Sequence, residues 1–249
     1  MKGKAWVSDM NLLAIESSGR VASAAVIREG RLVAEYTLDN GLTHSQTLLP
    51  MIDEIMKASK TEKESLDAIA ISKGPGSFTG LRIGSATAKG LGLALNIPLI
   101  EVSTLMGLAY NLKECTDRLV CPIIDSRRRE VYGAIYRFIP DNGGYACKCV
   151  MEDSAMTLEA FIGKLNEMNL PCIFTGDGVE AYGDYIKENI RCDYLLASGR
   201  NLIANAGAVA AVAAVMYEKG ITVSADEHSP EYLRLSQAER ELMEKNKGL

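Results

Sequence analysis

Short apolar runs and amphipathic stretches alternate along the chain of 249 residues and predict a regular order of strands and helices. In the first half, three strand-forming runs precede the first helical stretch, after which strands and helices alternate. The predicted strands are 11–15, 21–28, 31–38, 67–73 and 97–102, and the predicted helices are 44–59, 79–95 and 104–113.

The second half repeats this order. Its predicted strands are 119–124, 130–138, 145–151, 171–175 and 193–197, and its predicted helices are 157–168, 179–188 and 202–217. A duplicated unit of this kind predicts an α/β protein with the actin-like ATPase (ribonuclease H-like) fold, in which two related domains flank a cleft. We expect the domains at 10–103 and 104–249, with the helix 202–217 able to pack back onto the first.

The two units also begin alike, because an acid and a hydroxyl follow the first strand of each. Glu16 and Ser17 end one strand, and Asp125 and Ser126 end the other. Open α/β sheets bind ligands at the carboxyl ends of their strands. Two interpretations stay open: the two acids hold a magnesium–nucleotide across the cleft, or they act as turn formers.

A glycine-rich segment, 74–82, joins a predicted strand to a predicted helix. It lacks the Gly-Lys-Ser/Thr ending of a phosphate-binding P-loop. Ser77 or Thr79 is suited to cap the helix that follows. The segment is therefore either a structural turn or a ligand loop of another kind.

The helix after this segment is made largely of small residues. Glycine inside a helix costs about 0.5–1 kcal/mol relative to alanine, so its repeated use there needs an offset, such as close approach to another helix. The apolar stripe of the helix 44–59 offers such a partner, either within the chain or in another subunit. The candidate interface residues on the two helices are Leu48, Met51, Ile52, Ile55, Leu81, Arg82, Ile83, Ala86 and Gly90.

Composition and charge narrow the function classes. Hydrophobic residues make up 47% and charged residues 24%, as in ordinary globular proteins. No apolar run approaches the roughly 20 residues that cross a bilayer, and the N-terminus lacks a signal-peptide pattern, so we expect a cytoplasmic protein with reduced cysteines and no membrane contact. The net charge of −5, with one dense basic cluster at 127–129, predicts that RNA is reached only through a partner.

No catalytic constellation can be assembled from the two histidines. His44 and His228 lie far apart in the sequence, and neither belongs to a Ser-His-Asp, H-E-x-x-H or zinc pattern. We therefore expect no metal bound by this chain.

Six segments together resemble the TsaB family, once called YeaZ. They are 12–18, 44–50, 74–92, 122–132, 174–178 and 230–234, of which 74–92 is the most specific. The resemblance implies two actin-like domains, the second of them shortened. It also implies a scaffold role in a complex that transfers threonylcarbamoyl to an adenosine beside the tRNA anticodon.

The resemblance further implies the partners and the division of labour. The partners are a catalytic TsaD-like subunit and a TsaE-like ATPase, which use the metal and ATP. The chain alone is expected to form a homodimer through the helix 44–59, with its bulky apolar stripe, and the helix 79–95, with its small residues. The cleft, with Glu16, Ser17, Asp125, Gly176 and Asp177, is then a vestigial nucleotide site.

A comparison with the catalytic relative separates a scaffold from an enzyme. That relative carries two metal-binding histidines one helical turn apart, and the matching positions here are Thr104 and Leu108, with its aspartate ligand falling near Ala204. We therefore expect a non-catalytic subunit. The alternative is an actin-fold ATPase or small-molecule kinase with its own magnesium–nucleotide site at Glu16 and Asp125.

Overall fold

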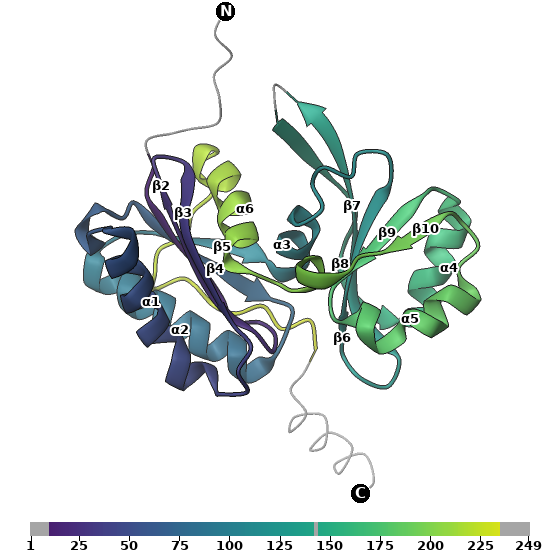
Figure 1. Cartoon of the computed structure of the whole chain (residues 1–249), viewed down its shortest axis with the longest axis horizontal. Helices are drawn as coiled ribbons and strands as arrows, with labels where there is room; N and C mark the ends of the chain where they lie inside the picture. The colour runs from purple at the N-terminus through teal and green to yellow at the C-terminus, as the bar shows by residue number, and fades with distance from the viewer. Residues whose placement is uncertain (1–9, 142–143, 235–249) are drawn as a thin grey trace, which may run out of the picture.

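The computed structural model describes residues 10–141 and 144–234, which form two lobes joined at the centre of the molecule (Figure 1). Each lobe contains one five-stranded mixed sheet. The expectations for residues 1–9 and for the end of the second domain, 235–249, lie outside the described residues.

The first lobe is built on β1 (Leu12–Glu16), a strand that is buried along its whole length. Its strands are β1 (Leu12–Glu16), β2 (Ala22–Arg28), β3 (Arg31–Leu38), β4 (Ala68–Gly74) and β5 (Leu99–Ser103), in the order β3-β2-β1-β4-β5. β2 runs antiparallel to β1 and β3, whereas β4 runs parallel to β1 and β5. Helices α1 (His44–Ser59) and α2 (Phe78–Leu95) cover one face of this sheet.

The second lobe has the same strand order. Its strands are β6 (Leu119–Asp125), β7 (Glu130–Asp141), β8 (Gly144–Thr157), β9 (Cys172–Thr175) and β10 (Tyr194–Leu196), in the order β8-β7-β6-β9-β10. Helices α4 (Leu158–Met168) and α5 (Gly178–Asn189) pack on this sheet around a core that includes Phe161 and Phe174. The matching order confirms the actin-like α/β fold predicted from the sequence.

Two helices cross between the lobes. α3 (Thr104–Tyr110) follows the first sheet but packs on β6 and β7, while α6 (Ala206–Glu218) follows the second sheet but packs on β1, β2 and β5. The helix predicted over 202–217 begins four residues later. A short 3₁₀ turn occupies Gly199–Leu202, and the Asn205 side chain caps α6 by accepting from Ala208 N at 2.9 Å.

The segment 221–234, called the strap below, returns along α2 to the junction of the lobes. His228 is buried in it: Nδ1 donates to Glu101 Oε1 at 2.7 Å, and Nε2 lies 2.9 Å from Ser85 Oγ. The strap ends at Arg234, which forms an ion pair with Glu130 of β7. His228 thus ties the strap to the first lobe, a role that sequence spacing could not show because its partners lie more than a hundred residues away.

Among the described residues, no helix has both the length and the apolar character needed to cross a membrane.

Candidate functional site

A cleft lies where the two lobes meet, and it has two connected parts. The outer part has a volume of about 550 Å³ and is lined by loops of both lobes and by the end of the strap. The inner part, about 130 Å³, reaches the start of α3. Ser18, Gly19, Arg20, Ile124 and Asp177 line both parts.

Glu16 lies behind the cleft rather than in it. Its Oε1 accepts from Ser18 N at 2.6 Å and from Ser18 Oγ at 2.5 Å, and its Oε2 accepts from Ser72 Oγ. The side chain is buried and absent from the lining of both parts of the cleft. Of the two open interpretations, this disfavours a magnesium–nucleotide held between Glu16 and Asp125, because the Glu16 oxygens are engaged by the chain itself.

Burial raises the pKa of the Glu16 carboxyl, opposed by hydrogen bonds from Ser18 and Ser72. The folded chain then holds this proton more tightly than the unfolded chain, whose pKa lies near 4.5. Stability therefore falls as the pH rises from about 4.5 through the raised pKa. We expect the free energy of unfolding of the wild type, measured in urea from pH 4.5 to neutrality, to fall relative to that of Glu16→Gln. A difference between the two proteins that stays constant with pH would contradict this assignment.

The glycine-rich segment is a structural turn packed against β1 and its following loop. A Cβ built on Gly76 would lie 2.3 Å from Ser18 O, and one on Gly80 would lie 2.1 Å from Ser17 O. Ser17 is itself buried and donates to Gly80 O at 3.0 Å. These glycines therefore allow the start of α2 to approach the chain's own backbone, as the structural interpretation predicts. The same segment also lines the outer cleft, so the interpretation as a ligand loop stays open.

Asp125 and Asp177 lie at the outer cleft on the second lobe. Asp177 Oδ1 accepts from Asp125 N at 2.9 Å, and Asp125 Oδ1 accepts from Tyr182 Oη at 2.6 Å. Gly176 positions Asp177 with φ +97°, where a Cβ would lie 2.2 Å from Ile123 O. The sequence therefore identified the acids on this lobe, and the structure brings them together.

The inner part of the cleft brings together Thr104, Leu108 and Ala204, the three positions singled out as lost metal ligands. The Thr104 Oγ1 atom is buried and has no hydrogen-bond partner among the described residues. A hydroxyl, an isobutyl group and a methyl group do not fit a divalent metal, which needs several N, O or S donors. Among the described residues, no group of three or more His, Cys, Asp or Glu side chains is placed to hold a metal ion.

The apolar stripe on α1 and α2 lies largely in the core of the first lobe. This corrects the expected interface for five residues, all buried: Leu48, Met51, Ile52, Ile55 and Leu81. Helical periodicity locates the buried face of a helix but does not show whether its own sheet or another chain covers it. Ile83 is partly buried against the same core.

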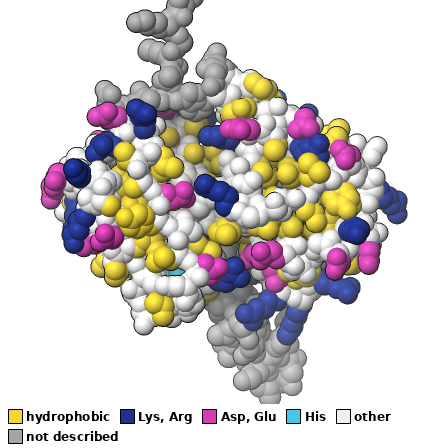
Figure 2. Space-filling view, viewed as in Figure 1, with side chains coloured by type: hydrophobic (Ala, Val, Ile, Leu, Met, Phe, Trp, Pro, Cys, Tyr) yellow, Lys and Arg dark blue, Asp and Glu magenta, His cyan; other side chains and the backbone are white. Residues whose placement is uncertain are grey.

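Another set of residues on α1 and α2 is exposed. It consists of Leu49, Arg82, Ala86, Gly90 and Leu93, called the α1–α2 surface below. Leu49 and Leu93 are 57% and 53% exposed, and a Cβ built on Gly90 would meet nothing within 4 Å. Apolar side chains are visible over this part of the first lobe in Figure 2. This surface is a place where a partner can contact both helices.

The fold and the cleft define the class as a two-lobed actin-like protein without a metal-holding group of three or more His, Cys, Asp or Glu side chains among the described residues. Residues 41–242 match the family model described as "TsaD: tRNA N6-adenosine threonylcarbamoyltransferase". The chain is similar to the tRNA threonylcarbamoyladenosine biosynthesis protein TsaB of Bacillus subtilis, with 31% identity over 96% of this chain and 100% of the relative. The Escherichia coli protein of the same name is 32% identical over 94% of this chain and 98% of the relative.

A solved structure, YeaZ from Pseudomonas aeruginosa, is 27% identical, with a TM-score of 0.75, and the match covers 90% of this chain and 100% of that one. The chain belongs to the TsaB (YeaZ) family, within the wider group that the transferase family model describes.

Proposed function

We propose that this chain is a non-catalytic scaffold subunit of the machinery that transfers threonylcarbamoyl to an adenosine of tRNA. Its task is to bind a TsaD-like catalytic subunit through the α1–α2 surface. The proposal rests on two observations: Thr104, Leu108 and Ala204 supply no metal-binding set in the inner cleft, and two neighbouring helices share an exposed, mainly apolar surface.

The inner cleft supports a role other than catalysis. A metal there would polarise the group being transferred. Thr104, Leu108 and Ala204 supply one hydroxyl and two hydrocarbon groups in its place. The rival hypothesis, an ATPase or kinase centred on Glu16 and Asp125, loses its first acid because Glu16 already accepts three hydrogen bonds within the lobe.

The α1–α2 surface supports docking. Interfaces bury apolar side chains at their centre, and small residues let two helices approach closely. Ala86 and Gly90 are four residues apart on α2, and Leu93 follows within one turn. A helix of the partner can therefore lie against this stripe without meeting a bulky side chain at Gly90.

The remaining members of the proposed assembly follow from the family. A TsaE-like ATPase joins the two subunits, so ATP and the metal are used by the partners and this chain needs no cofactor. In the absence of the catalytic subunit, the α1–α2 surface forms a homodimer. Because the assembly acts on tRNA, we propose that it works in the cytoplasm.

Gel filtration tests the docking step. The chain mixed with the TsaD-like subunit of the same organism should elute with it in one peak, at a larger size than either protein alone. Separate elution of the two proteins at micromolar concentration would contradict the proposal.

A further inference from the structure

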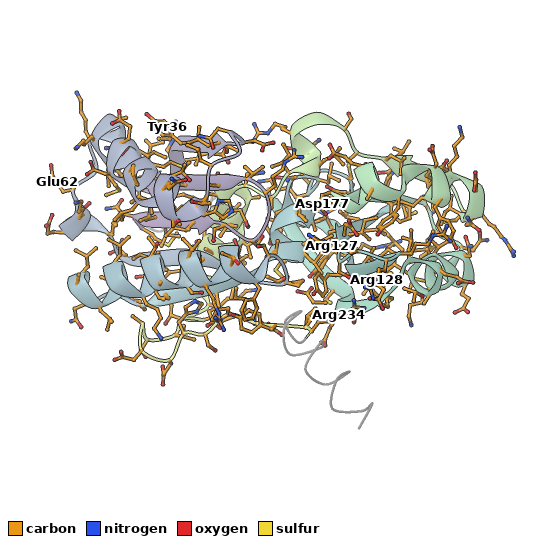
Figure 3. The ribbon with its side chains drawn as sticks, turned by 90° about the horizontal axis from the view of Figure 1, so that it is seen from below. Tyr36, Glu62, Arg127, Arg128, Asp177 and Arg234 are labelled. Atoms are coloured by element: carbon orange, nitrogen blue, oxygen red, sulfur yellow. The ribbon has the colours of Figure 1, made fainter. Side chains whose placement is uncertain are left out.

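The turn between β6 and β7 presents three arginines in a row, Arg127, Arg128 and Arg129, and the scaffold role gives them no task. All three are exposed. In the part of the chain that the structure describes, no carboxylate forms an ion pair with any of them. Figure 2 shows Lys and Arg side chains projecting at this lower edge of the second lobe, and Figure 3 places Arg127 and Arg128 near Arg234.

The backbone of this turn adopts a conformation that arginine rarely takes. Arg127, Arg128 and Arg129 have φ values of 69°, 58° and 60°. The left-handed region costs a side chain about 1–2 kcal/mol per residue, and glycine avoids that cost. If this turn served only to reverse the chain direction, glycine or asparagine would be expected at these positions.

Contacts on both sides hold the turn in place. Arg127 N donates to Asp125 Oδ1 at 2.7 Å, and Glu130 N donates to Arg127 O at 3.1 Å. Arg129 N donates to Tyr182 Oη at 3.2 Å. Successive side chains in a helical turn point ~100° apart, so three guanidinium groups fan outward from a fixed backbone.

Aromatic and hydroxyl groups surround the same edge of the cleft. The Arg129 guanidinium lies over the Tyr185 ring, 5.4 Å from its centroid. Ser126, Tyr132 and Tyr232 line the outer cleft beside Arg127, and Tyr232 is 39% exposed. Proteins bind single-stranded nucleic acid by this combination of guanidinium groups for phosphates and exposed aromatic rings for bases.

We infer that the Arg127–Arg129 turn contacts consecutive phosphates of the tRNA substrate within the assembled complex. The inference rests on the proposed function, which supplies the RNA. It adds a direct contact to the expectation that tRNA reaches this acidic chain only through the complex. The net charge of −5 does not prevent such a contact, because salt screens distant charges beyond about 8 Å at physiological ionic strength.

A salt titration tests the contact. Binding of fluorescently labelled tRNA to the complex of this chain with the TsaD-like subunit is measured for wild type and for Arg127→Gln/Arg128→Gln. The double variant should bind on the order of tenfold or more weakly, and the slope of log K against log salt should fall by about 1–2. The control, Arg31→Gln/Lys63→Gln, removes the same charge from the first lobe. Lys63 follows Glu62, which lies at the end of the first lobe far from the arginines (Figure 3). It should leave affinity and slope nearly unchanged.

A second variant separates an RNA contact from a purely structural turn. Arg128→Gly relieves the left-handed strain, so it should keep or raise the unfolding temperature while weakening tRNA binding. Unchanged tRNA affinity and slope in both arginine variants would overturn the inference. Loss of co-elution with the TsaD-like subunit in the double variant would also overturn it, because the arginines would then bind protein.

If the wild-type chain forms no complex, the proposed function fails, and the arginine turn is tested on the isolated chain. There, weak tRNA binding at about 50 mM salt should be lost in Arg127→Gln/Arg128→Gln and kept in the control. No difference between these two variants would overturn the inference.

Discussion

Gly90→Leu is expected to abolish co-elution with the TsaD-like subunit while leaving the chain folded. Gly90 is exposed on α2, and a Cβ at this position would meet no atom within 4 Å, so the isolated chain has room for leucine. The helix should even gain up to about 1 kcal/mol, because leucine is a better helix former than glycine. A partner helix packed closely on this stripe would instead meet a bulky isobutyl group, which we expect to weaken binding at least on the order of 100-fold.

Gly163→Leu is the matched control for this experiment. Gly163 lies in α4 of the second lobe, and its Cβ position also meets nothing within 4 Å. The control should therefore share the gain in helix stability and keep the partner. Gel filtration with the TsaD-like subunit and thermal unfolding of each variant measure both effects. Unchanged co-elution of the Gly90 variant would show that the α1–α2 surface is not where the partner docks.

Gly80→Ala is expected to destabilise the chain by about 3 kcal/mol, at the upper end of the cost of overpacking. The new methyl group would lie 2.1 Å from Ser17 O and 3.2 Å from His44 Cδ2. The carbonyl belongs to backbone held between β1 and α2, so neither side can move without losing contacts. The unfolding temperature should fall by roughly 6–12 °C for a chain of this size.

Gly183→Ala is expected to stabilise the chain, whereas Gly80→Ala destabilises it. Gly183 is also helical, but its Cβ would meet Leu196 Cδ1 at 3.7 Å, an ordinary contact. Alanine should therefore stabilise α5 by up to about 1 kcal/mol. Calorimetric unfolding of the two variants under one set of conditions compares them. An unfolding temperature for Gly80→Ala within a degree or two of the wild type would show that the turn at α2 does not depend on this close approach.

Much of the fold was predictable from local pattern. Helix α1 begins and ends where the spacing of Leu48, Met51, Ile52 and Ile55 predicts, and the repeated order of elements identified the duplication. The start of α6 was missed because the apolar residues at 202–204 extend the helical pattern, whereas in the structure a 3₁₀ turn and the Asn205 cap precede the helix. Periodicity does not detect such a cap when apolar residues flank it on both sides.

The candidate site was predictable only in part. Asp125, Asp177 and the trio Thr104, Leu108 and Ala204 do meet at the cleft. Glu16 does not, because the serines that engage it come from a loop and from a strand 56 residues away. Likewise, the helical pattern of α1 did not show what covers its apolar stripe, and in the structure this chain's own sheet covers it.

Reconstitution of tRNA modification tests the central claim, that this protein supports the reaction without performing it. Purified TsaD-like and TsaE-like proteins, tRNA, ATP and the threonylcarbamoyl donor would be incubated with and without this chain, and the modified adenosine would be measured. We predict modification only when all three proteins are present, and none with this chain alone. Modification that proceeds equally well without it, or turnover by this chain in isolation, would contradict the scaffold role.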